Sequence, residues 1–195
     1  MAAEVTLRIA TGEDVPVLSR LISDSARALS RGFYTEAETE SAIRYVFGVD
    51  TELIRDGTYY VAHRDGSLAG CGGWSRRNTL YGGDQRPVGE ASLLDPLSDA
   101  ARIRAFFVAP QAARRGVGRA LLHECARAAA QSGFRALTLM ATLPGVPFYS
   151  ALGFVADEDV VDVLPDGTPL RFVRMSRPIG EAMVPGQTPA EVRTP

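Results

Sequence analysis

A chain of 195 residues is short enough that we expect a single domain. Its apolar fraction of 46% and charged fraction of 23% are those of an ordinary soluble globular protein. The 21 basic and 23 acidic side chains give a net charge of −2, which argues against a general nucleic-acid binder, because such proteins carry a basic excess.

The two cysteines, Cys71 and Cys125, lie far apart in the chain and lack the spacing of metal ligands. We interpret them as reduced structural thiols of a cytoplasmic protein, because disulfides are rare in that compartment. We expect no metal site. The first ten residues, MAAEVTLRIA, contain no basic segment followed by an apolar one, so we expect no signal peptide.

An uncharged run over residues 136–156 is long enough for a membrane helix. Prolines and glycines interrupt it at Pro144, Gly145, Pro147 and Gly153. The run therefore fits better as a strand, a turn, a short helix and a second strand inside a soluble core, and we expect no membrane association.

The N-terminal quarter contains signals for one strand and two helices. Residues 4–10 alternate between polar and apolar side chains that favour a strand. A capping-box pattern at 11–14 predicts a helix to about Leu29, and the same pattern at 35–38 predicts a second helix to about Phe47.

A β-hairpin is predicted next. Residues 58–64 and 68–75 have strand composition and flank Asp65-Gly66, a strong hairpin signal. Residues 76–100 follow, rich in Gly, Pro and Asp and without periodicity. Loops of this length inside a compact domain tend to be functional or disordered.

A strand–helix–strand unit is predicted in the third quarter. The strand 102–108 stops before Pro110, a helix with one apolar face covers 117–132, and a strand covers 135–141. Such a unit places its two strands parallel to each other.

The remaining elements complete the predicted fold, which contains no internal repeat. A short helix at 147–152 precedes strands at 153–160 and 170–176. We expect an α/β (α+β) protein with a mixed central sheet of about six to seven strands and about four helices on its faces. We assign one domain to 1–177 and a disordered Pro-rich tail to 178–195.

Two glycines stand where the long helix begins, although glycine is a poor helix former. A strand that turns directly into a helix exposes unpaired N–H groups, which together with the helix dipole favour an anion. Gly116 and Gly118 would let it approach closely, and three arginines nearby, Arg114, Arg115 and Arg119, add positive charge. The pattern is neither a Walker A loop nor a dinucleotide fingerprint, and by itself it also fits a simple tight turn.

A second motif gives the glycine turn a context. The stretches FFVAP, RRGVGRALL and FYSALGF follow one another over residues 106–154. In this order and spacing the chain resembles the GNAT-type N-acetyltransferases, and the resemblance covers Ala101 to about Asp157. It implies the GNAT fold and acetyl-coenzyme A (acetyl-CoA) as cosubstrate.

The resemblance also implies roles for individual residues. Phe106, Phe107 and Val108 would pair with the pantetheine arm like an extra strand, and Tyr149 would donate a proton to the departing thiolate. The pyrophosphate would be bound, through backbone N–H groups, by Arg114, Arg115, Gly116, Val117, Gly118 and Arg119.

The chain departs from the family pattern at three places. Ala113 holds a position that is Arg or Gln in the family, so Arg114 would replace that contact. Thr142 stands where many relatives carry an Asn, and it can still donate one hydrogen bond to the cofactor. Some relatives carry a base glutamate on the strand after the long helix, but the run 136–156 is uncharged.

The reaction needs a base and an oxyanion donor. An alkyl amine, whose pKa is about 10.4, attacks a thioester only when neutral, so a base must take its proton. The open candidates are Glu90, Asp95, Asp99 and water. A free N–H near Phe107 or Val108 would stabilise the oxyanion.

Other polar residues receive weaker assignments. His63 and His123 are interpreted as structural or surface residues. Substrate selectivity is expected from residues 30–50 and 74–100, where Trp74 with Arg76 and Arg77 either lines an acceptor pocket or is a packed aromatic beside solvated arginines.

We therefore expect an acyltransferase that moves an acetyl group from acetyl-CoA to a primary amine by direct attack in a ternary complex. The acceptor stays open between a small molecule, an amino acid and a protein terminus. The alternatives are a non-enzymatic acyl-CoA sensor of the same fold and a nucleotide-binding module of another type. A homodimer is left open.

Overall fold

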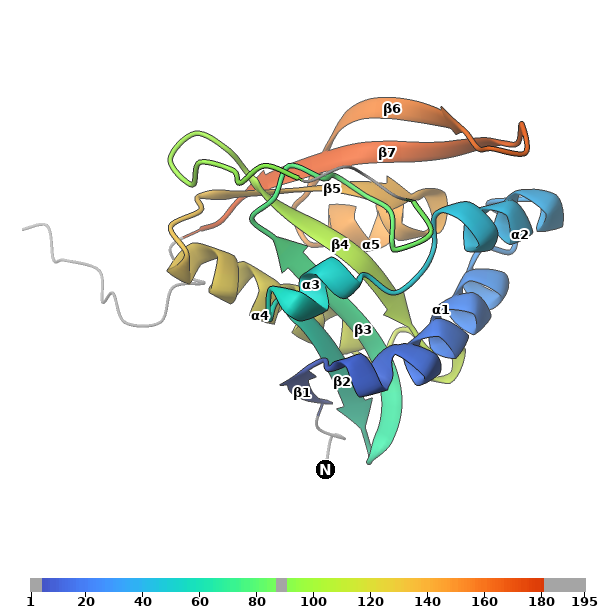
Figure 1. Cartoon of the computed structure of the whole chain (residues 1–195), viewed down its shortest axis with the longest axis horizontal. Helices are drawn as coiled ribbons and strands as arrows, with labels where there is room; N and C mark the ends of the chain where they lie inside the picture. The colour runs from blue at the N-terminus through green and yellow to red at the C-terminus, as the bar shows by residue number, and fades with distance from the viewer. Residues whose placement is uncertain (1–4, 87–90, 181–195) are drawn as a thin grey trace, which may run out of the picture.

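The computed structural model describes residues 5–86 and 91–180. They form one seven-stranded sheet in the order β1-β2-β3-β4-β5-β7-β6 (Figure 1). Only β4 and β5 are parallel; every other pair of neighbours is antiparallel. The predicted mixed sheet is confirmed. Its strands are β1 (Val5–Ile9), β2 (Tyr59–Arg64), β3 (Ser67–Ser75), β4 (Ala101–Val108), β5 (Ala136–Thr142), β6 (Val155–Val163) and β7 (Pro169–Pro178).

Helices cover both faces of the sheet. The first three lie on one face, and α4 and α5 lie on the other (Figure 1). One more helix is present than the four predicted, because α3 is too short to show an apolar period. The helices are α1 (Val15–Leu29), α2 (Glu36–Tyr45), α3 (Thr51–Arg55), α4 (Val117–Gln131) and α5 (Val146–Ala151).

Local signals fix where the early elements begin. The Asp14 carboxylate accepts from the Thr11 N–H at 2.8 Å and closes a short turn that leads into α1. At α2 the bonds are reciprocal: Glu38 accepts from the Thr35 N–H at 2.7 Å, and Thr35 accepts from the Glu38 N–H at 3.2 Å. Both predicted capping boxes are confirmed, and such caps stabilise a helix by about 1 kcal/mol.

The predicted hairpin between β2 and β3 is also confirmed. Asp65 and Gly66 have φ values of 52° and 75°, the positive pair that a two-residue turn of type I′ requires. The hairpin lies next to the centre of the sheet, because its second strand, β3, pairs with β4.

The predicted β4–α4–β5 unit is confirmed, but its two strands stay together only briefly. They pair from Ala101–Leu137 to Ile103–Leu139 and then diverge. Just beyond, Ala105 has a φ of 53°, and the register between β4 and β3 shifts by one residue. This is a β-bulge, which bends a strand and redirects its side chains.

A buried tyrosine holds the bulge from β2. Tyr59 is fully buried, and its hydroxyl donates to the Ala105 carbonyl at 3.1 Å. Residues on β2 and β4 are thus joined across β3. The hydroxyl partners a carbonyl that the bulge has taken out of the regular ladder.

The last strand, β7, stays paired with β5 up to its C-terminal end. Pro178 lies opposite Ala136 at the end of β7, and the Ile179 N–H donates to the Arg135 carbonyl at 2.8 Å. Residues 181–195, on which most of the predicted tail falls, lie outside the described residues. Among the helices that the structure describes, none is long and apolar enough to cross a membrane.

We expect Tyr59→Phe to lower the free energy of unfolding by about 1–2 kcal/mol, because the Ala105 carbonyl loses its buried donor. Urea denaturation measures this value. Tyr45→Phe is the matched control, since Tyr45 is half-buried and its hydroxyl has no hydrogen-bond partner in the described part of the chain. Equal losses in the two variants would contradict the role given to the Tyr59 hydroxyl.

Candidate active site

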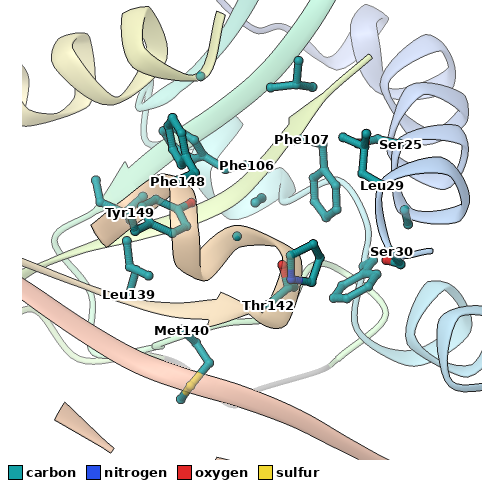
Figure 2. A pocket seen from close by; sticks show the side chains of 18 of the residues that line it. Ser25, Leu29, Ser30, Phe106, Phe107, Leu139, Met140, Thr142, Phe148 and Tyr149 are labelled. Atoms are coloured by element: carbon teal, nitrogen blue, oxygen red, sulfur yellow. The ribbon is translucent and has the colours of Figure 1, made fainter. Parts of the chain in front are cut away.

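A cavity of about 900 Å³ opens where β4 and β5 diverge. Its walls come from α1, the α2–α3 connection, β4, the glycine turn before α4, and α5. Figure 2 shows side chains from these elements pointing into one space, with Tyr149 and Phe148 on one side and Ser25, Leu29 and Ser30 on the other.

Unpaired amides of β4 face the divergence. The Ala109 N–H donates to the Ala69 carbonyl at 2.9 Å, and Phe107 pairs with Cys71. Because hydrogen bonds alternate along an antiparallel pair, the amides of Phe106 and Val108 point away from β3. Past Ile103 no β5 residue pairs with them. The sequence analysis expected a free N–H near Phe107 or Val108, and these two amides are the candidates for it.

The two phenylalanines line the cavity from opposite faces of the sheet. Phe106 lies over Gly72, where an added Cβ would stand 2.4 Å from the ring. Phe107 points the other way and meets Phe47 edge to face, with ring centroids 5.7 Å apart. In Figure 2, Phe106 lies toward the Phe148 side of the cavity and Phe107 toward the Leu29 side. Gly72 therefore makes room for a ring in the cavity wall.

The glycine turn has the geometry of an anion site. Arg114 and Gly116 have φ values of 61° and 85°, and Gly116 caps α4 with no side-chain hydrogen bond. Nothing lies within 4 Å of the position that a Gly116 Cβ would take. Gly118 differs from the expectation, since its Cβ would stand 3.0 Å from Phe148. The absence of a side chain at Gly118 therefore first allows Phe148 of α5 to pack against α4. Room for a ligand is a second effect.

The arginines of the turn divide into two groups. Arg114 and Arg119 are exposed and line the cavity, together with Ala113, Val117 and both glycines. Arg115 does not line it, and its carbonyl accepts from the Arg64 guanidinium. The positive charge that the glycine turn contributes to the cavity wall therefore comes from Arg114 and Arg119.

Tyr149 faces the cavity from α5. Its ring packs between Phe148 and Phe154, with centroid distances of 5.0 and 5.5 Å, and the residue is 8% exposed. Its hydroxyl is directed into the cavity and has no hydrogen-bond partner within the described residues (Figure 2). Burial raises the pKa of Tyr149, so the hydroxyl stays protonated and can act as a proton donor.

The end of β5 is held by a tyrosine that the sequence analysis missed. Thr142, which the sequence analysis proposed as a cofactor contact, ends β5 and lines the cavity. The Tyr34 hydroxyl accepts from the Leu143 N–H at 2.9 Å and donates to the Arg171 carbonyl. It joins the α1–α2 connection to β5 and β7. Burial raises the pKa of Tyr34 to about 12.

A buried ion-pair cluster lies behind the cavity wall. Arg104, which lines the cavity, is 2.6 Å from the Asp50 carboxylate and 3.0 Å from that of Glu52. Burial raises the pKa of Asp50 to about 6, although Arg104 pulls it down. Asp50 also caps α3 through the Leu53 N–H. Asp50 and Arg104 are 54 positions apart in the chain, so no local sequence pattern predicts that they pair.

Trp74 and its neighbours do not form an acceptor pocket. Trp74 is 4% exposed, packs edge to face on Phe134 and is outside the cavity lining. Arg77 pairs with Asp56 at 2.8 Å. The packed-aromatic alternative for Trp74 is confirmed, because its ring completes the core next to the end of α4.

Two of the candidate bases lie far from Tyr149. The Asp99 carboxylate accepts from the Asp95 N–H at 2.8 Å in a turn beside Gly133, past the C-terminal end of α4. The cavity lies at the N-terminal end of this helix, roughly 22 Å away at 1.5 Å per residue. Glu90 lies outside the described residues.

The histidines also stand apart from the cavity. His63 is on β2 and His123 is exposed on α4; neither lines it. Within residues 5–86 and 91–180, no group of three or more His, Cys, Asp or Glu side chains is arranged to hold a metal ion.

Solved structures share this fold over most of the chain. A GCN5-related N-acetyltransferase from Rhodopseudomonas palustris is 19% identical, with a TM-score of 0.68 over 91% of this chain and 98% of that one. The PaiA N-acetyltransferase of Thermoplasma acidophilum, in complex with coenzyme A, is 16% identical, with a TM-score of 0.58 over 90% and 99%. YncA of Salmonella typhimurium, with acetyl-CoA, is 14% identical, with a TM-score of 0.58 over 96% and 99%.

A search of curated proteins finds no match. The model of the acetyltransferase (GNAT) family, in contrast, matches residues 23–154, which include α2, the β4 bulge, the glycine turn and Tyr149. With this match over most of its length and with this fold, the chain belongs to the acetyltransferase (GNAT) family, whose enzymes take their acetyl group from acetyl-CoA.

Proposed function

We propose that this protein transfers an acetyl group from acetyl-CoA to a primary amine, by direct attack in a ternary complex. The observation that carries the proposal is the divergence of β4 and β5, with the glycine turn beside it and Tyr149 facing it. Coenzyme A or acetyl-CoA is bound in the PaiA and YncA structures, which share the fold.

The residues present fit this cosubstrate. The unpaired amide of Val108, which is nearer to the glycine turn than that of Phe106, offers a strand-like hydrogen bond to a pantetheine arm. The open backbone at Gly116 and the exposed Arg114 and Arg119 suit a pyrophosphate. Acetyl-CoA would supply an activated acetyl group and a thiolate leaving group.

The chain's own groups then have separate tasks. The Phe106 N–H would donate to the thioester carbonyl oxygen, where negative charge develops as the amine nitrogen bonds to the carbon. The Tyr149 hydroxyl would donate its proton to the sulfur as the carbon–sulfur bond breaks, and solvent would return a proton to it. A raised pKa suits this role, because the donor must be protonated before the reaction.

The proton of the amine leaves to water in this proposal. Asp95 and Asp99 lie at the wrong end of α4, and the described cavity wall includes neither a carboxylate nor a histidine. Of the sequence-based candidates, Glu90 remains the alternative to water. An Asp95→Asn variant is therefore expected to keep the parent kcat/KM.

Reversing one charge tests the pyrophosphate site. We expect Arg119→Glu to weaken acetyl-CoA binding roughly ten- to hundredfold, because a charge-assisted contact is lost and a repulsive charge is added. Glutamate near the start of α4 favours the helix dipole, so the variant should fold. Calorimetric titration measures the dissociation constant.

The matched control for this test is Arg135→Glu, an exposed arginine beyond the opposite end of α4. It changes the net charge by the same amount at a distance from the cavity. Equal weakening in both variants would show a general charge effect and would contradict a site at the glycine turn.

Removing one hydroxyl tests the proton donor. We expect Tyr149→Phe to lower kcat roughly 10²-fold with little change in acetyl-CoA affinity, because the ring keeps its packing on Phe148 and Phe154. Steady-state thiol release, with an amine that the parent enzyme acetylates, measures kcat, and calorimetry measures binding. Tyr45→Phe is the control.

Parent-level turnover in the Tyr149→Phe variant would remove Tyr149 from the mechanism, and lost binding with normal kcat would make it a cosubstrate contact. A parent protein that binds acetyl-CoA but releases no thiol with any primary amine would be the non-enzymatic sensor.

A further inference from the structure

One end of the cavity is walled by aromatic rings. It lies beside Ser25, Leu29 and Ser30, across the cavity from Tyr149 (Figure 2). Phe107 and Phe47 meet edge to face there, and Tyr81 packs on Phe172 with centroids 5.3 Å apart. All four rings line the cavity.

Two further apolar side chains stand at the mouth. Phe33 is 48% exposed and Leu29 is 37% exposed, and both line the cavity. Exposed large apolar side chains beside a hollow mark a surface that a ligand covers. A flat apolar body that entered here would be enclosed by rings on several sides.

The carboxylates bonded to this wall are already paired with arginines. Arg104 contacts Asp50 and Glu52 and also donates to the Gly82 carbonyl. Asp162 accepts from the Tyr81 hydroxyl at 3.0 Å and is paired with Arg86. Within the described residues the wall therefore offers no free negative charge, and a second ammonium on the acceptor would be desolvated without a partner.

Two serine hydroxyls add polar groups to the wall. Ser25 and Ser30 are 3% and 4% exposed and line the cavity. Neither side chain has a hydrogen-bond partner among residues 5–86 and 91–180. Buried hydroxyls normally find a partner, so these two are suited to accept from a neutral amine or to bond a small polar substituent.

Resting on the acetyltransferase function proposed above, we infer that the acceptor is an aromatic primary monoamine, with one amine group on or near an aromatic ring and no second cationic group. Aromatic walls, compensated carboxylates and unpartnered hydroxyls all match this chemistry. They disfavour polyamines, aminoglycosides and lysine side chains.

Three small acceptors separate the contributions of ring and charge. Benzylamine has the ring and one amine, 4-(aminomethyl)benzylamine adds a second ammonium to the same ring, and ethanolamine has no ring. We expect kcat/KM for benzylamine to exceed each of the others by about tenfold or more. Thiol release at saturating acetyl-CoA measures this. Equal or higher values for the diamine or for ethanolamine would overturn the inference.

A pair of variants tests whether the acceptor binds beside Phe33. Phe33→Ala is expected to raise KM for benzylamine about tenfold and to leave KM for acetyl-CoA unchanged. Leu97→Ala, at a position that is 78% exposed and outside the cavity lining, should change neither. An unchanged benzylamine KM in Phe33→Ala would overturn the placement of the acceptor beside α1.

Failure of this inference and failure of the proposed function give different results. Calorimetry with acetyl-CoA alone needs no acceptor, so absent binding would reject the acetyltransferase proposal itself. Binding followed by faster acetylation of the diamine or of ethanolamine would keep the acetyltransferase and reject only the aromatic monoamine. Binding without acetylation of benzylamine would also reject the aromatic monoamine.

Discussion

One bulge in β4 controls the rest of the site. Ala105 takes a φ of 53°, a left-handed value that costs energy for a residue with a Cβ. The buried Tyr59 hydroxyl stabilises it by partnering the carbonyl that leaves the ladder. Past this point β4 stays paired with β3 but leaves β5, so its outward amides have no strand partner. The proposed cosubstrate site lies in the gap that opens here between β4 and β5.

Glycines allow the diverging elements to pack closely. The Phe106 ring occupies the place of a side chain at Gly72, and Phe148 occupies the place of one at Gly118. Only Gly116 needs glycine for its backbone conformation at the start of α4. Gly72 and Gly118 are therefore explained by the rings that occupy the place of their side chains, and both of those rings line the cavity.

Local patterns in the sequence predicted the helices and strands. The roles of residues whose partners are far away in the chain could not be predicted in this way. The capping boxes at Thr35 and Thr11 and the turn at Asp65 act within four residues, so they are readable in the sequence. The motifs around Gly116 and Tyr149 identified the family. In contrast, the roles of Tyr34, Tyr59 and Arg104 depend on partners 46 to 137 positions away. The sequence left Trp74 open between an acceptor pocket and a packed aromatic, because its contact with Phe134, 60 positions away, decides between the two.

The double hydrogen bond of Tyr34 connects the two halves of the reaction site mechanically. Phe33, its neighbour in the chain, lines the cavity, while Leu143, whose N–H donates to Tyr34, begins the turn that leads into the helix carrying Tyr149. A displacement of Tyr34 relative to that turn would strain or break this hydrogen bond. In the reaction proposed here, the acceptor wall and the helix that carries the proton donor are thus linked through one phenol ring.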